Sequence, residues 1–282
     1  MTVPVVFISK TLGGGTSLLP IATECASKNN DVFLLGDEGN KEFCKGEFIP
    51  FERYSSGYKE FEELYTHLST NDPEIEKFCI SRWFILRDFM HDNNIEMVFH
   101  VDWDVLCFAN ITKDSHRFKH LDCAISGRTS GNQAFFSREG ITKICDYILK
   151  LYKDKNGFDF QRIAIGYHLR QHYKLNGGVC DMNFLEHYAR FVAHHAVGEL
   201  SLVSSNPDDY FYELHMGVAE GFETEHGPQG RLKKVYKFIN GIPYSKHLRT
   251  GRDIPFATVH FQGPNKPLIE KFYKLCNDSI FR

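Results

Sequence analysis

The sequence lacks the features that would place it among membrane-spanning, disulfide-stabilised or nucleic-acid-binding proteins. No apolar run approaches the roughly 20 residues that a membrane-spanning helix needs, so no transmembrane segment is expected. The net charge is −3 and no long basic run occurs, which argues against nucleic acid as a partner. The first apolar stretch, Val3 to Ile8, is too short for a signal peptide and lacks a basic head.

Cysteines are present, but they are not arranged as a framework. Eight are dispersed along the chain, and no Cys-x-x-Cys pair occurs. Dispersed cysteines in apolar stretches are typical of reduced thiols that are buried as small hydrophobic groups. A reducing compartment, the cytoplasm, is therefore expected.

The order of the first elements predicts an α/β fold. With 282 residues, of which 42% are apolar, the chain can bury a substantial core. A buried strand at 5–9 is followed by a glycine-rich turn, a helix to about residue 28 and a second strand at 31–36. This order begins a doubly wound, mostly parallel sheet. Further helices are expected at 54–68, 73–91, 141–152 and 184–192, further strands at 95–101, 124–125 and 133–136, and short strands and loops from about 201 onward.

Two aspartates follow the apolar strand in the middle of the chain. In an extended segment, Asp102 and Asp104 would point the same way and Trp103 the other. Ligands bind outside the carboxyl ends of strands in open α/β sheets, and paired carboxylates there suit a hard cation. The alternative is that the aspartates cap the next helix or begin a loop.

A second polar motif lies near the end of the chain, from His260 to Pro267 (His-Phe-Gln-Gly-Pro-Asn-Lys-Pro). If its imidazole is a third ligand beside the two aspartates, the preferred cation shifts from Mg²⁺ toward Mn²⁺, which accepts mixed oxygen and nitrogen ligands. Taken alone, His260 reads as a core histidine at the end of a strand at 256–261.

The two motifs together resemble those of nucleotide-sugar glycosyltransferases with the GT-A fold. Residues 99–111 are similar to the aspartate-x-aspartate strand of the glycogenin-like group, including its Ala-Asn-Ile ending, and 260–267 are similar to that group's C-terminal motif. The resemblance implies one GT-A (Rossmann-like) domain over 1–282, a mixed, mostly parallel sheet flanked by helices with an irregular C-terminal acceptor-side region. Residues 1–112 would form the nucleotide-sugar-binding half and 113–282 the acceptor-side half.

The resemblance also implies a role for each matched residue. Asp102 would contact the ribose or reach the metal through water, whereas Asp104 and His260 would bind the metal directly. Gly263 would let the backbone approach the diphosphate closely, and Lys266 would place its ammonium on the phosphate.

Other donor-binding candidates come from neighbouring segments. Arg82 falls where the family carries a basic residue near the donor; Arg87 is the competing choice, and a solvated helix face is the alternative for both. The remaining candidates are Ser9, Thr11 and Leu12 where the base docks in this fold, Trp103 between the aspartates, and Asn132 and Gln133 beside the donor sugar. Because 131–133 departs from the family's asparagine-serine-glycine order, the identity of the sugar does not carry over.

Asp181 is the catalytic candidate. It follows a glycine-rich turn as in the family, although Met182 stands where the family has glutamine. A carboxylate near the acceptor hydroxyl would act as a general base and invert the anomeric centre, while one beneath the sugar ring fits retention; the stereochemistry stays open. The alternative for Asp181 is helix N-capping.

The sequence therefore predicts a metal-dependent glycosyltransferase. It would move a hexose or pentose from a UDP-sugar to a hydroxyl of a glycan or polysaccharide acceptor, with Mn²⁺ or Mg²⁺ as cofactor. The segment 210–244, rich in tyrosine, histidine and glycine, would shape the acceptor side. Two alternatives remain: a metal-dependent nucleotide-sugar phosphohydrolase and a non-catalytic nucleotide-sugar binder.

Overall fold

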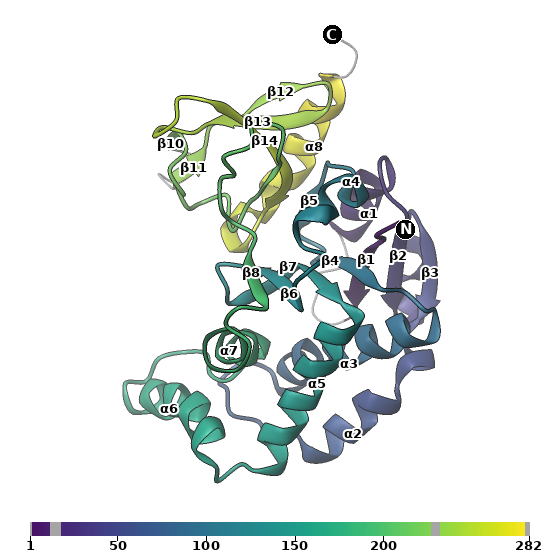
Figure 1. Ribbon diagram of the computed structural model, residues 1–282, viewed down its shortest axis with the longest axis vertical. Coiled ribbons are helices and arrows are strands. Elements are labelled where there is room, and N and C mark those ends of the chain that lie inside the picture. The colour runs from purple at the N-terminus through teal and green to yellow at the C-terminus, as the bar shows by residue number, and fades with distance from the viewer. Residues whose placement is uncertain (1, 12–17, 227–231, 280–282) are drawn as a thin grey trace.

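The protein is built around a seven-stranded sheet (Figure 1). The structure, a computed structural model, describes residues 2–11, 18–226 and 232–279. The strand order is β3-β2-β1-β4-β7-β6-β8, in which only β7 runs antiparallel to its neighbours. The strands are β1 Val5–Ser9, β2 Val32–Gly36, β3 Glu47–Pro50, β4 Met97–Val101, β6 Cys123–Ser126, β7 Ser130–Ser137 and β8 Val197–Glu199. The predicted mixed, mostly parallel sheet is confirmed.

A second sheet packs beside the first one. Its order is β12-β13-β14-β5, with β9 also paired to β14. The strands are β5 Val105–Cys107, β9 Phe211–Tyr212, β12 Lys237–Ile239, β13 Ile242–Lys246 and β14 Asp253–His260, and a separate ribbon joins β10 Thr224–His226 to β11 Leu232–Lys234. In the antiparallel pair of β14 and β5, His260 lies opposite Val105. This register brings the C-terminal motif to the segment that follows the two aspartates.

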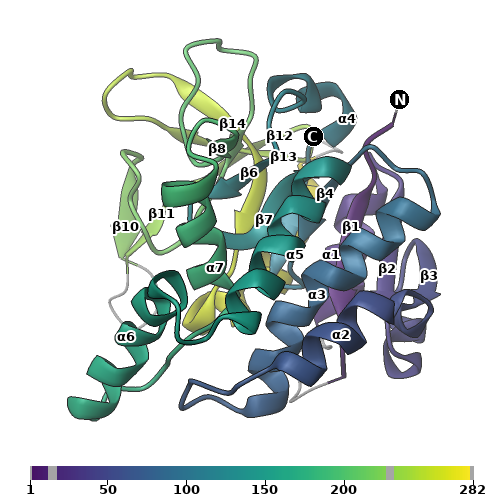
Figure 2. The same cartoon turned by 60° about the horizontal axis from the view of Figure 1, so that its bottom comes forward.

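Helices cover both faces of the central sheet. The α-helices are α1 Leu19–Ser27, α2 Ser56–Leu64, α3 Pro73–Asp92, α4 Ile111–Asp114, α5 Arg138–Lys153, α6 Phe158–His172, α7 Asp181–His187 and α8 Ile269–Asp278. Short 3-10 helices occur at Glu38–Phe43, Phe51–Tyr54, Ser115–Arg117 and Gly263–Leu268, and a short π-helix follows α7 at Tyr188–Val192. Both views place α2, α3 and α5 side by side (Figures 1 and 2).

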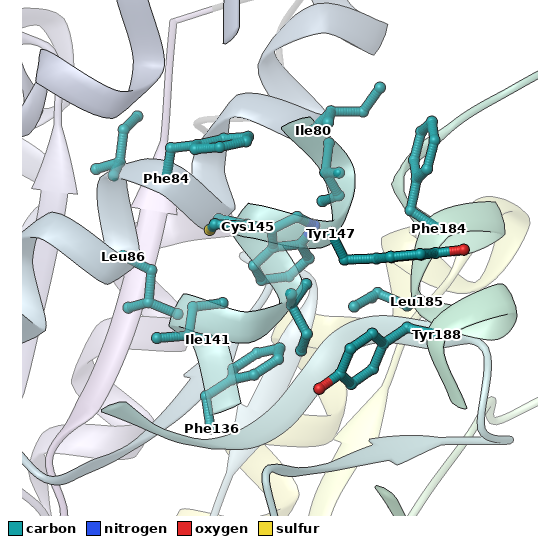
Figure 3. Packing of buried hydrophobic residues seen from close by; sticks show 14 of the residues in the cluster. Ile80, Phe84, Leu86, Phe136, Ile141, Cys145, Tyr147, Phe184, Leu185 and Tyr188 are labelled. Carbon is teal, nitrogen blue, oxygen red and sulfur yellow. The ribbon is translucent and has the colours of Figure 1, made fainter. Parts of the chain in front are cut away.

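The buried residues of β1 show why the core has two halves. Val6 and Ile8 belong to one apolar cluster and Val5 and Phe7 to the other, because successive side chains of a strand point to opposite faces. Figure 3 shows the first cluster, in which side chains of β7, α5 and α7 meet those of α3. The second cluster joins α1, β5, β14 and α8. A strand buried on both faces reads as a continuous apolar run, as 5–9 does.

Residues at the N-termini of the long helices α3 and α5 explain where these helices begin. Pro73 occupies the first turn of α3, and the Asp72 side chain accepts hydrogen bonds from the backbone N–H groups of Glu74 and Ile75. Ser137 caps α5 in the same way, through the N–H of Gly140 at 3.0 Å.

The sequence-based boundaries are correct for the central elements and incomplete elsewhere. The helix expected at 54–68 is shorter and spans Ser56–Leu64. The helix expected at 184–192 begins at Asp181 and changes to a π-helix after His187. Neither α6 nor α8 is among the helices predicted from the sequence. Within the described residues, no helix combines the length and apolar character needed to cross a bilayer.

Candidate functional site

The two aspartates lie on a turn and not on an extended strand. β4 ends at Val101, and the N–H of Val105 donates to the carbonyl of Asp102 at 3.1 Å. The prediction that Asp102 and Asp104 share one face of a strand is therefore wrong, because the turn directs their carboxylates to different partners.

Asp104 meets the C-terminal motif. Its Oδ1 lies 3.6 Å from Nε2 of His260, and its Oδ2 lies 3.2 Å from the ammonium of Lys266. The backbone continues this contact, since the N–H of Phe261 donates to the carbonyl of Asp104 at 2.9 Å. The pairing of β14 with β5 thus fixes an acid, an imidazole and an ammonium in one place.

The orientation of the His260 ring is set by its other nitrogen. The carbonyl oxygen of Leu214 lies 2.7 Å from Nδ1 and accepts a hydrogen bond from it, and the amide group of Asn132 lies 2.7 Å from the same nitrogen. Nε2 is therefore the nitrogen that faces Asp104. Burial disfavours the charged ring, but the hydrogen bond and charge of Asp104 outweigh burial and raise the pKa of His260.

Asp102 is held by a buried guanidinium. Arg82 donates from Nη1 to Asp102 and from Nη2 to Asp181, each at 2.6 Å. Burial opposes ionisation of Asp102, but the charge of Arg82 outweighs burial and lowers its pKa to about 2. Nε2 of His100 lies 3.3 Å from the same carboxylate. Arg82 therefore joins the aspartate turn to the start of α7.

These contacts decide between the alternatives left open by the sequence. Arg82 is only 9% exposed, so the solvated helix face is wrong for it, whereas Arg87 pairs with Asp88. Cys180, and not Asp181, is the N-cap of α7, so the capping alternative for Asp181 is wrong as well. The negative charge of Asp181 is still well placed, because it lies in the first turn of the helix.

The loop after β14 contains a glycine in a left-handed backbone conformation. Gly263 has φ +57°, and a Cβ placed on it would meet nothing within 4 Å. Glycine adopts this left-handed backbone without a steric cost. Lys266, at the end of the same turn, also lies over the ring of Trp103, 3.7 Å from its centroid.

The remaining candidates lie in three different settings. Thr11 donates from its N–H and its hydroxyl to Asp37, each at 2.7 Å, so its side chain is tied to the end of β2. Ser9 is buried at the end of β1, where its carbonyl accepts from Asn40 at 3.1 Å. Leu12 lies outside the described residues.

Gln133 is not brought to the aspartate turn. Its side chain is fully buried, donates to the carbonyl of Glu213 and accepts from the hydroxyl of Thr258. Both ends of the amide are therefore used inside the protein. Asn132, its neighbour on β7, points to His260 because alternate residues of a strand face opposite sides.

Glu213 and His100 contribute to this site although the sequence does not mark them as functional. Glu213 accepts from the backbone N–H of His260 at 3.0 Å and pairs with the buried Lys234 at 2.8 Å. His100 lies beside Asp102, with 3.3 Å between its Nε2 and Oδ1 of the carboxylate. Nothing in the local pattern distinguishes these residues, because their partners are distant in the chain.

The predicted metal ligands are neighbours, but they do not form a closed set. In the part of the chain that the structure describes, no group of three or more His, Cys, Asp or Glu side chains is arranged to hold an ion. The reason is that Asp102 turns to Arg82, which leaves Asp104 and His260 as an oxygen and nitrogen pair. Such a pair suits a divalent cation that accepts mixed ligands.

Comparison with known proteins identifies the fold. No protein-family model matches the chain, and no curated protein matches it. The crystal structure of an active-site mutant of LgtC is similar with a TM-score of 0.50 and 13% identity, covering 98% of this chain and 95% of that one.

Two further structures are similar at lower scores. LgtC in complex with donor and acceptor sugar analogs has a TM-score of 0.48 at 13% identity, covering 98% of this chain and 95% of that one. Apo mouse xyloside xylosyltransferase 1 has a TM-score of 0.45 at 11% sequence identity, covering 71% of this chain and 86% of that one. Because the LgtC mutant reaches 0.50 over nearly the whole length, the fold of this protein is the GT-A fold.

Proposed function

We propose that the protein is a metal-dependent glycosyltransferase that moves a hexose or pentose from a UDP-sugar to a hydroxyl of a glycan or polysaccharide. One observation carries the proposal. Asp104, at the carboxyl end of a central strand of a GT-A fold, contacts His260 and Lys266 from the far end of the chain. Open α/β sheets bind their ligands at this edge.

The residues present fit a divalent cation by the chemistry of their donor atoms. Asp104 supplies a carboxylate, and His260 directs Nε2 toward it while Leu214 holds Nδ1. These two side chains would hold Mn²⁺, or Mg²⁺, together with the phosphates of the donor. When bound, the cation supplies positive charge that stabilises the leaving diphosphate.

The cationic side chains at the site suit the same reaction. Breaking the bond between sugar and diphosphate leaves negative charge on the phosphate, and an ammonium placed there stabilises the charge as it develops. Lys266 carries such a group on a short turn beside Asp104. Gly263, at the start of that turn, leaves open space where a side chain would stand, so the diphosphate can approach the backbone.

Asp181 is proposed to act at the sugar. Arg82 holds its carboxylate at 2.6 Å and connects it to Asp102. A carboxylate fixed in this way can bind sugar hydroxyls or face the reacting carbon. Whether the anomeric centre inverts or is retained follows from the position of the acceptor hydroxyl relative to Asp181.

A donor panel tests the proposal. Purified protein is incubated with nucleotide sugars and Mn²⁺, with and without glycan acceptors, and nucleotide release and glycan mass are measured. We expect UDP release from one donor, stimulated by acceptor and abolished by a chelator. Asp104→Asn should lower activity at least about a hundredfold, since even outer-shell changes at metal sites cost 10–100-fold.

Asp253→Asn is the matched control, because Asp253 is an exposed carboxylate paired with Lys237 away from the site. It should keep full activity. Nucleotide release that no acceptor stimulates would identify a phosphohydrolase instead. Tight donor binding without release would identify a binder, and either result would overturn the transferase proposal.

A further inference from the structure

Helix α6 is apolar on two opposite sides. It lies at the edge of the molecule in both views (Figures 1 and 2). Its inner side buries Phe160, Ile163 and Ala164, and the ring of Phe160 packs against Tyr152 with 5.3 Å between centroids. This side attaches the helix to α5, and Asp159 and Arg162 add contacts to His187 and to the ring of Phe191.

The outer side carries a second apolar row. Phe158, Ile165, Leu169 and Tyr173 are 78%, 56%, 52% and 66% exposed. Their spacing of seven, four and four residues places them along one face, because a helix turns about 100° per residue. That face lies opposite the buried one. Surface helices normally expose polar residues there, so an exposed apolar row indicates a surface that another molecule covers.

Basic residues accompany the outer row. The segment 158–175 contains Arg162, Arg170 and Lys174 but only one acidic residue, Asp159, whereas the whole chain has a net charge of −3. All four of these charged residues are exposed. The segment is therefore a positive patch on a chain of opposite net sign, and its charge complements an anionic partner.

The geometry of α6 favours a lipid surface over a second copy of the chain. In a two-fold dimer through this face, the same positive patch would face itself. Ile165 borders a hollow between α6 and α7, whereas Phe158, Leu169 and Tyr173 are exposed on a protruding helix. Long basic side chains beside such a row can keep their charges at lipid headgroups while the apolar groups enter the interface.

We propose that the outer face of α6 docks on an anionic lipid bilayer, with Phe158, Ile165 and Leu169 inserted at the headgroup boundary and Arg170 and Lys174 among the headgroups. The helix would lie in the plane of the membrane and would not span it. The inference does not depend on the proposed transferase activity, because no residue of α6 contacts Asp104 or Arg82 among the contacts described above.

Vesicle sedimentation tests the proposal with the full chain. Vesicles of phosphatidylcholine alone are compared with equal parts of phosphatidylcholine and phosphatidylglycerol. We expect binding to the anionic vesicles, weakened by salt. The double variant Phe158→Ser, Leu169→Ser should bind at least about tenfold more weakly, because two large apolar side chains no longer leave water. Lys174→Gln should lower binding about fivefold, as expected for one basic residue near an anionic surface.

Leu202→Ser with Leu248→Ser is the matched control, since these leucines are 61% and 64% exposed but lie away from α6. This pair should bind vesicles like the unchanged protein. Equal binding to neutral and anionic vesicles, no vesicle binding, or an unaffected α6 double variant would overturn the proposal. So would sedimentation velocity showing a dimer that the α6 double variant abolishes. Circular dichroism and nucleotide release, measured in parallel, separate a folding or catalytic failure from loss of docking.

Discussion

The guanidinium of Arg82 donates a hydrogen bond of 2.6 Å to Asp181, which lies 99 positions later in the chain. The second terminal nitrogen of the same guanidinium, Nη1, donates to Asp102. One buried cation thus connects the long helix α3, the aspartate turn and the first residue of α7. The contact ties the donor side of the proposed site to the side where the sugar would react.

Removing this cation should destabilise the fold. Arg82→Gln would leave two ionised carboxylates close together with no counter-charge, and the loss of one partner from a buried ion pair costs about 3–5 kcal/mol. Urea denaturation should show a fall in the free energy of unfolding of about 3 kcal/mol. Arg190→Gln serves as control, because Arg190 and Glu186 form an exposed pair. Its effect should stay within about 0.5 kcal/mol. A loss as small as this in Arg82→Gln would contradict the stabilising role given to the buried guanidinium.

Asp102 should contribute to stability in a pH-dependent way. Its pKa falls from 3.8 to about 2 on folding, so the contribution is present above about pH 4 and is lost as the pH falls toward 2. The shift corresponds to about 2 kcal/mol. Unfolding free energies of the unchanged protein and of Asp102→Asn, measured across this range, should therefore converge at the acid end. A constant difference would contradict the role given to Arg82.

Gly263→Ala separates backbone strain from ligand approach. Its φ of +57° and open surroundings mean that a methyl group meets no atom, so the cost is the left-handed backbone, about 1–2 kcal/mol. Gly251 has φ +67° and equally open surroundings, which makes Gly251→Ala a matched control for strain. Thermal unfolding should show similar losses in the two variants. UDP binding, measured by calorimetry, should weaken only in Gly263→Ala; equal affinities would argue against a diphosphate at this turn.

Cation binding should depend on the protonation of His260. Its pKa is raised above the ordinary value of 6.5 because Asp104 favours the charged ring. A metal ion must displace that proton, so Mn²⁺ affinity in the presence of UDP should rise between about pH 6 and about pH 8. Electron paramagnetic resonance of free Mn²⁺ measures this directly. In His260→Ala the affinity should be low and nearly independent of pH. His91→Ala, in the last turn of α3 where the imidazole contacts Thr142, should behave like the unchanged protein.

Much of the frame follows from local patterns in the chain. The apolar runs that become β1 and β4 are buried on both faces, so their boundaries read directly from hydrophobicity. Pro73 marks the start of α3 as predicted, whereas α5 begins at Arg138, three residues before the predicted start at 141. The missed helix α6 has a weaker local signal, because it is apolar on two sides and so shows no single apolar face.

By itself, the sequence determined which groups are available: an acidic pair after a buried strand, and a histidine, a glycine and a lysine at fixed spacing near the end. Only the tertiary structure decided which of these groups contact one another. The turn after β4 sends Asp102 to Arg82 and Asp104 to His260, and the register of β14 on β5 places the imidazole. The physical reason is range: propensity and periodicity act over a few residues, whereas these ion pairs join segments that only packing brings together.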